Sequence, residues 1–302
     1  MTWFMTYQKK LFDAICKSGS VLCAGIDPVP EAMPAGFREP GTSIHDMVLD
    51  WCRCIVEQAC SKVAAYKINL AYFEALGPDA YRLVEEVVRA VPSGKIIIAD
   101  AKRGDVPHSN ERYKAAFFDR FGFDAITLSP FMGMETLAPF LDDESRAVYA
   151  LALTSNPGAA DLMTKPFGKS PTLSAHLASL LRTCSHEHPG SLGMVIGATQ
   201  SEMYGPVMQA FPEAPLLIPG IGAQAGSIQD LEKHLCGHTG LPLINVSRGL
   251  SAFDPKNKKP WKEQISENTD RFHALLQPIT DAVILRNSAK NRLDPPKKKK
   301  PF

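Results

Sequence analysis

Two carboxylates and an ammonium group fall within the six residues from Asp100 to Asp105, whose sequence is D-A-K-R-G-D. An apolar run at residues 96–99 precedes them and predicts a buried parallel strand. Because side chains alternate along a strand, Asp100 and Lys102 should point to the same side. Pro107 favours the first turn of a helix directly after this cluster. Charged groups so close together can donate a proton or stabilise charge in a reaction, although an ordinary loop salt bridge has the same spacing.

The elements that must position this cluster alternate along the chain. Apolar runs predict strands at about residues 21–27, 63–69, 96–100, 124–129, 147–154, 192–197, 215–219 and 241–246. Helical patterns fall around them, at about residues 6–18, 43–61, 79–90, 108–121, 133–141, 172–187, 200–210 and 226–236. Strands alternating with helices at roughly 30 residues per unit favour a (β/α)8 TIM barrel over an open doubly wound sheet.

Polar residues recur at the carboxyl ends of the predicted strands. They are Asp27, Lys67, Asp100, Lys102, Ser155 and Arg248. Each of them alone is explained by a turn, a helix cap or a solvated charge. In a barrel the strand ends converge on one mouth, where active sites form, so we expect these side chains to share a site.

Two stretches have the composition of a phosphate site. Residues 219–226, P-G-I-G-A-Q-A-G, follow the seventh predicted strand, and their glycines allow close backbone approach to an anion. Arg248 follows the eighth strand and can hold a phosphate through two hydrogen bonds. The loops after strands seven and eight are the usual phosphate site of such barrels.

Composition argues against several other classes of protein. The 302-residue chain is 45% hydrophobic with a formal net charge of +1, which gives no general reason to expect binding to nucleic acid or a membrane. We see no signal-peptide pattern and no apolar run near ~18 residues, so we expect a cytoplasmic protein. The seven cysteines form no C-x-x-C pair and the histidine clusters lack ligand spacing, so we expect reduced thiols and no metal site.

The motifs resemble the second subgroup of the orotidine 5'-phosphate decarboxylase family. D-A-K-R-G-D is similar to the D-x-K-x-x-D signature of that family. Further stretches that are similar to it, in the expected order, lie at residues 24–28, 66–69, 130–133, 154–158, 197–199, 219–224 and 247–249. The resemblance extends from about residue 10 to residue 253.

The resemblance implies that orotidine 5'-monophosphate loses its C6 carboxylate to give UMP and CO2, the last step of de novo pyrimidine synthesis. It implies no metal or organic cofactor. The catalytic residues would form an alternating charge array of Lys67, Asp100, Lys102 and Asp105. Asp100 would face the substrate carboxylate, Lys102 would protonate the remaining carbon, and Lys67 would hold the acid and contact the ribose.

The same resemblance implies the substrate-binding residues and a homodimer. Asp27 would bind a ribose hydroxyl, and Ser155 would hydrogen-bond the pyrimidine. Gln224 and Arg248 would bind the phosphate. Asp105 and Ser109 would act across the interface, in the partner's site. The sequence V-P-H after Asp105 departs from the family, which more often has Ile-Gly there, so the role of Ser109 is the least secure.

Three alternatives stay open. A Mg²⁺-dependent sugar-phosphate decarboxylase or synthase on the same barrel would share D-x-K-x-x-D, with an added carboxylate from another strand. A Schiff-base aldolase using Lys67 or Lys102 would need a lowered lysine pKa, which flanking aspartates oppose. A non-catalytic phosphate-binding barrel would need none of these charges to react.

The C-terminal end differs in composition from the barrel. We expect a barrel domain at residues 1–280 and a tail or linker at residues 281–302, which contains four consecutive lysines, Lys297 to Lys300. A solvated tail is favoured over a nuclear-import or acidic-partner patch. Because some members of the family are fused to orotate phosphoribosyltransferase, that enzyme is a candidate fused or associated partner.

Overall fold

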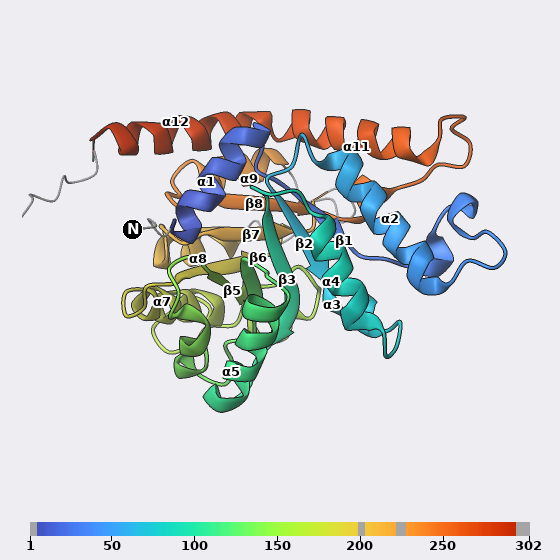
Figure 1. Cartoon of the computed structure of the whole chain (residues 1–302). Helices are drawn as coiled ribbons and strands as arrows, with labels where there is room; N and C mark the ends of the chain where they lie inside the picture. The colour runs from blue at the N-terminus through green and yellow to red at the C-terminus, as the bar shows by residue number, and fades with distance from the viewer. Residues whose placement is uncertain (1–4, 199–202, 222–227, 294–302) are drawn as a thin grey trace, which may run out of the picture.

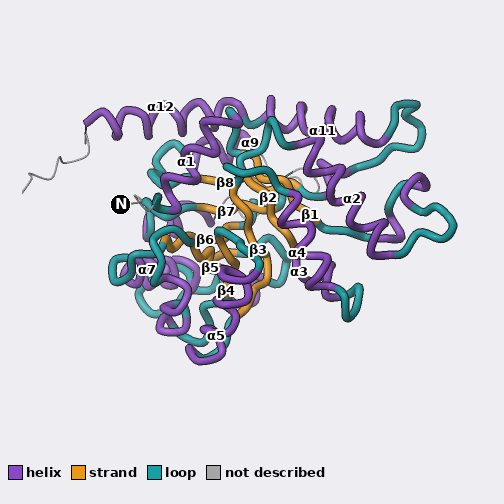
Figure 2. The backbone as a smooth tube through the Cα atoms, viewed as in Figure 1, coloured by secondary structure: helices purple, strands orange, loops and turns teal. Residues whose placement is uncertain are grey.

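Eight parallel strands close into a barrel, as the sequence predicts. The computed structural model describes residues 5–198, 203–221 and 228–293. The strands are β1 (Leu22–Ile26), β2 (Ala65–Asn69), β3 (Ile96–Arg103), β4 (Ala125–Leu128), β5 (Ala147–Leu153), β6 (Ser191–Ile196), β7 (Leu216–Pro219) and β8 (Pro242–Val246). They follow one another in chain order around the barrel, and β8 pairs with β1 to close it (Figures 1 and 2).

The helices lie outside the strands and cover them (Figure 2). They are α1 (Tyr7–Ser18), α2 (Ile44–Ala59), α3 (Leu70–Glu74), α4 (Ala80–Ala90), α5 (Pro107–Lys114), α6 (Ala159–Leu162), α7 (Leu173–Ser185), α8 (Tyr204–Ala210), α9 (Ile228–Leu235), α10 (Arg248–Ser251), α11 (Trp261–Leu275) and α12 (Gln277–Leu293). Helices cover the outer face of the strands, and packed side chains fill the inside of the barrel. Both faces of the strands are therefore buried, which explains their continuous apolar sequences.

Local sequence signals place the starts of several helices. Ser43 Oγ accepts a hydrogen bond of 3.1 Å from the Asp46 amide at the start of α2, as expected for a cap. Thr172 Oγ1 does the same for α7, at 3.0 Å from the Ala175 amide. Pro107 is the first residue of α5, as its missing N–H and fixed φ favour.

Two predicted helices differ from the structure. In place of one helix at 133–141 there are two 3-10 turns, Met134–Thr136 and Ala138–Leu141. Thr136 donates its hydroxyl to the Gly133 carbonyl, and Pro139 has no N–H to continue an α-helix. The predicted helix at 108–121 divides into α5 and a π-helical segment, Ala115–Arg120.

The C-terminal helices pack on the outside of the barrel. The predicted domain boundary at residue 280 falls within α12, and Val283 beyond it is buried in the common core. Arg286 donates to the Leu235 carbonyl oxygen of α9 at 3.2 Å, and α12 also contacts α1 (Figure 1). The expectation of a tail or linker from residue 281 is therefore wrong as far as Leu293. The lysine run lies outside the described residues.

The structure also describes the state of the cysteines and the length and polarity of the helices. All seven cysteines are free thiols. Within residues 5–198, 203–221 and 228–293, no helix has the length and apolar character to cross a membrane.

Candidate active site at the mouth of the barrel

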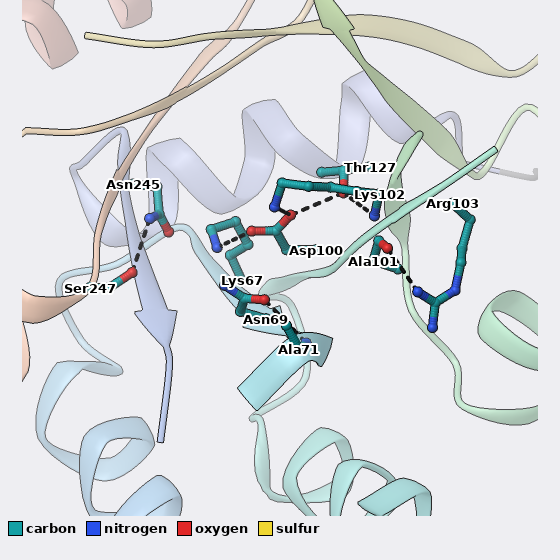
Figure 3. A network of polar contacts seen from close by, with 10 residues as sticks. All are labelled: Lys67, Asn69, Ala71, Asp100, Ala101, Lys102, Arg103, Thr127, Asn245 and Ser247. Atoms are coloured by element: carbon teal, nitrogen blue, oxygen red, sulfur yellow. Dashed lines mark hydrogen bonds and ion pairs between the residues drawn. The ribbon is translucent and has the colours of Figure 1, made fainter. Parts of the chain in front are cut away.

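Asp100, near the end of β3, is the centre of a buried polar network (Figure 3). Lys67, on β2, donates from Nζ to Asp100 Oδ2 at 2.6 Å. Lys102 donates from Nζ to the other oxygen, Oδ1, at 2.5 Å. Thr127, on β4, donates its hydroxyl to the same Oδ1 at 3.1 Å. The carboxylate is therefore held by two ammonium groups and one hydroxyl.

The backbone brings Lys102 back to Asp100 through an irregularity in β3. Ala99 pairs with Ile126 and Arg103 pairs with Leu128, so residues 100–102 lie opposite Thr127 alone. Lys102 has a φ of 47°, in the left-handed region. The two side chains meet, as predicted, but they do so through this bulge and not through regular strand alternation.

The charges in the network keep Asp100 ionised. Burial by itself raises the pKa of Asp100, but the nearby Lys67 and Lys102 ammonium groups lower it more, so the pKa lies well below its usual value. Burial by itself lowers the pKa of Lys67, and Asp100 and Asp27 reverse this effect, so its pKa is raised. Both groups are therefore charged at neutral pH.

A cavity beside the network contains most of the predicted binding residues. Its lining includes Asp27, Lys67, Asp100, Ser155 and Arg248, which come from the ends of five strands. The prediction that polar side chains from different strand ends share one mouth is confirmed for these five, and the sixth, Lys102, contacts Asp100 without lining the cavity.

Two polar atoms in this lining are left for a ligand. Asp27 Oδ1 and Asn245 Oδ1 are buried and have no hydrogen-bond partner among the described atoms. Leaving a buried acceptor unpaired is costly, so each marks a position where a bound molecule can supply a donor.

A close backbone approach sets the position of Ser155. A Cβ atom on Gly197, directly after β6, would lie 2.4 Å from the Ser155 amide nitrogen. Only glycine at this position leaves room for the loop that carries Ser155 into the cavity.

Two predicted residues within the described part of the chain belong neither to the network around Asp100 nor to the cavity lining. Asp105 and Ser109 lie just before and within α5, and neither is among the described residues that line the cavity. Asp105 Oδ1 accepts from the Val106 amide at 2.7 Å. Gln224 lies outside the described residues.

Sequence reasoning assigned no role to Thr127 or Asn245. Thr127 is a polar residue between the apolar Ile126 and Leu128 of the predicted strand at 124–129, and such a residue is a signal that a buried hydroxyl has a specific partner. Asn245 lies next to the phosphate motif at the end of β8, and its Nδ2 donates to Ser247 Oγ at 3.2 Å.

Comparison with known families decides to which group this barrel belongs. The model of the orotidine 5'-phosphate decarboxylase / HUMPS family matches residues 20–259. The chain belongs to this family. The match begins before β1 and ends after α10, so it includes every described residue of the network and the cavity.

Curated relatives match most of the chain. An orotidine 5'-phosphate decarboxylase from Dehalococcoides mccartyi is 35% identical over 250 residues, which are 82% of this chain and 88% of that protein. Another from Verminephrobacter eiseniae is 39% identical over 227 residues, which are 74% of this chain and 81% of that protein. The resemblance seen in the motifs is thereby confirmed.

Solved structures share the barrel. An orotidine 5'-monophosphate decarboxylase of Leishmania donovani superposes with a TM-score of 0.72 at 30% identity and covers 90% of this chain and 99% of its own. A UMP synthase from the same organism gives a TM-score of 0.76 at 29% identity over 93% of this chain. This chain spans only 57% of that UMP synthase.

Proposed function

We propose that this protein decarboxylates orotidine 5'-monophosphate to UMP and CO2, the last step of de novo pyrimidine synthesis. Family membership and the decarboxylase relatives support the reaction. The observation that carries the proposal is the buried Asp100, held ionised between two ammonium groups beside a cavity that contains Arg248. This arrangement suits decarboxylation, because negative charge develops on a carbon atom that a nearby ammonium group can stabilise and then protonate.

The charge network suggests how the bond is broken. The C6 carboxylate of the substrate lies against Asp100, and their repulsion is relieved when the bond to C6 breaks and CO2 leaves. The electron pair stays on C6, where the Lys102 ammonium stabilises it and then transfers a proton to it. The Lys102 side chain is 51% exposed, so solvent can restore its proton. Every step uses groups of the chain itself, and we propose that no metal or organic cofactor takes part.

The cavity provides contacts for the rest of the nucleotide. The unpaired Asp27 Oδ1 accepts a hydrogen bond from a ribose hydroxyl, and Lys67 contacts the ribose. Ser155 hydrogen-bonds the pyrimidine. Arg248, together with Gln224, binds the phosphate. Binding energy from the phosphate, remote from the reacting carbon, helps to organise the site.

We further propose a homodimer in which Asp105 and Ser109 complete the partner's site. The large apolar side chains of Val106, Phe131 and Met132 are 48%, 59% and 49% exposed. Val106 directly precedes α5, and Phe131 and Met132 precede the 3-10 turn Met134–Thr136. These two elements contact each other, because Asn110 of α5 donates to the Thr136 carbonyl oxygen at 2.7 Å. Exposed apolar side chains on adjoining elements are typical of an interaction surface.

We also propose a cellular location and a protein partner. The protein acts in the cytoplasm, on free nucleotides, without nucleic acid or a membrane. The longer UMP synthase supports orotate phosphoribosyltransferase as a fused or associated partner. We propose that the barrel is one domain, and the packing of α12 against α1 and α9 supports including this helix in it.

The test is the loss of substrate absorbance in the ultraviolet, measured with purified protein in EDTA. We expect fast turnover by the wild type and a fall in kcat of about 10²- to 10⁴-fold in Lys102→Ala. Lys17→Ala, at the exposed end of α1, serves as the control and should match the wild type.

Other outcomes would contradict the proposal in different ways. Near-normal turnover by Lys102→Ala would refute the proton-donor role. Activity only with Mg²⁺ and a sugar phosphate would favour the sugar-phosphate alternative. No turnover under either condition would leave a barrel that binds without catalysing.

A further inference from the structure

Thr127 lies at the point where β3 departs from regular pairing. Its hydroxyl accepts a hydrogen bond of 3.0 Å from the Lys102 amide and donates one of 3.1 Å to Asp100 Oδ1. The side chain is 1% exposed. One buried hydroxyl therefore joins the backbone of one charged residue to the side chain of the other (Figure 3).

The Lys102 backbone needs such a support. Among the described residues, Lys102 is the only one other than glycine with a positive φ. A residue with a Cβ adopts this conformation at a cost, and it persists only where the surroundings hold it. Because of the bulge, Lys102 is not part of the regular hydrogen-bond ladder between β3 and β4. Its amide donates a hydrogen bond to the Thr127 hydroxyl instead.

We propose that Thr127 is a positioning residue for the decarboxylation. Its hydroxyl holds Lys102 in the left-handed conformation and fixes the rotation of the Asp100 carboxylate, which aims the Lys102 ammonium at the reacting carbon. The proposal rests on the proposed function for its kinetic consequence. Its structural part, the link between the hydroxyl and the Lys102 backbone, stands without it.

The hydroxyl and the shape of the side chain can be separated with two variants. Thr127→Val keeps the shape and removes the hydroxyl, whereas Thr127→Ser keeps the hydroxyl and removes a methyl group. We expect Thr127→Val to lower kcat by about 10²-fold, because misplacing a reacting group by about 1 Å costs that much. KM should change by less than about 3-fold, because the phosphate contacts are separate. Thr127→Ser should retain kcat within about 3-fold of the wild type.

A matched control shows whether losing any buried hydroxyl has this effect. Thr269 is also fully buried, and it donates to the Ile265 carbonyl within α11, at 2.8 Å. Thr269→Val should lower the melting temperature but leave kcat unchanged. Wild-type kcat in Thr127→Val, or an equal loss in Thr127→Ser and Thr127→Val, would overturn the positioning role.

A crystal structure of Thr127→Val tests the inference independently of activity. We expect φ of Lys102 to leave the left-handed region and its ammonium to separate from Asp100. An unchanged Lys102 conformation and contact would refute the inference even if kcat fell. Absence of turnover in the wild type would refute the proposed function, while this structure would still decide the role of Thr127. Should Thr127→Val fail to fold, the same two measurements on Thr127→Ser decide the matter: the wild-type φ and kcat are expected, and loss of either overturns the inference.

Discussion

In the proposed mechanism Asp100 repels the substrate carboxylate only while it is ionised, and Lys67 and Lys102 keep it ionised. The Asp100 and Lys67 side chains are 9% and 5% exposed, so neither ion has much contact with water. A buried ion pair contributes little net stability over an apolar pair, but loss of one partner leaves an uncompensated charge. The network therefore adds little to stability, and in the proposed mechanism its value is a fixed electric field at the reacting carbon.

Lys67→Met should lower the free energy of unfolding at pH 7 by about 3–5 kcal/mol, because it leaves Asp100 buried with less compensation. The lowered pKa of Asp100 means that its stabilising contribution is complete above its ordinary pKa of 3.8 and is lost as pH falls through the folded-state pKa. The raised pKa of Lys67 means that its own contribution is complete below 10.5. The difference between wild type and variant should therefore be constant from pH 6 to 8 and shrink below about pH 4.

The measurement is urea unfolding at several pH values. Lys9→Met, which breaks the exposed Lys9–Asp13 pair, is the control and should change stability by less than about 1 kcal/mol. A difference between wild type and Lys67→Met that is as large at pH 3 as at pH 7 would show that Asp100 is not the group responsible.

At the scale of elements, the ends of the strands carry the site and the loops between them adjust it. β1, β2, β3 and β8 end beside one cavity, and each places a polar side chain there. The loop after β5 brings Ser155 to the same cavity only because Gly197, the residue after β6, has no side chain. Precision at the mouth therefore depends on close contact between neighbouring strand ends.

Gly197→Ala should move this loop, because the new Cβ would lie 2.4 Å from the Ser155 amide. We expect a loss of stability of about 1–3 kcal/mol and about 10-fold weaker binding of UMP, measured by thermal melting and titration calorimetry. Gly205→Ala in α8 is the control, because its Cβ would meet nothing within 4 Å. Unchanged UMP binding by Gly197→Ala would mean that Ser155 does not contact the nucleotide.

At the scale of the whole molecule, one chain gathers all the described parts of the site except Asp105 and Ser109. Both belong to the segment around the start of α5, beside exposed apolar side chains. A closed dimer with two-fold symmetry would use this segment twice, once for each site.

Mixing two inactive variants tests whether the sites are shared. Lys102→Ala and Asp105→Ala would each be inactive alone, and exchange of subunits would create hybrids with one intact site. An equal mixture should recover about a quarter of the wild-type activity, because half of the dimers are hybrids with one working site of two. If Asp105 acted within its own chain, no hybrid would contain an intact site and the mixture would stay inactive.

Local sequence was sufficient to predict the barrel, the starts of α2 and α5, and the grouping of Asp27, Asp100 and Arg248 at one mouth. These features follow from the periodicity of apolar residues, the chemistry of caps and the rule that parallel strands end on one side. The motif D-A-K-R-G-D and the stretches around it also led to the family, because their residues and their order are specific.

How the charged residues meet depends on tertiary contacts. The bulge in β3 and the left-handed Lys102 depend on the register with β4, and that register is a property of two strands and not of one. The role of Thr127 follows from the same register. The packing of α12 could not be predicted from local sequence either. The short apolar run around Val283 is buried only because α1 and α9 lie beside it. The periodicity of apolar residues predicts single helices and strands but not which distant segments contact each other. Those contacts determine the geometry of the site.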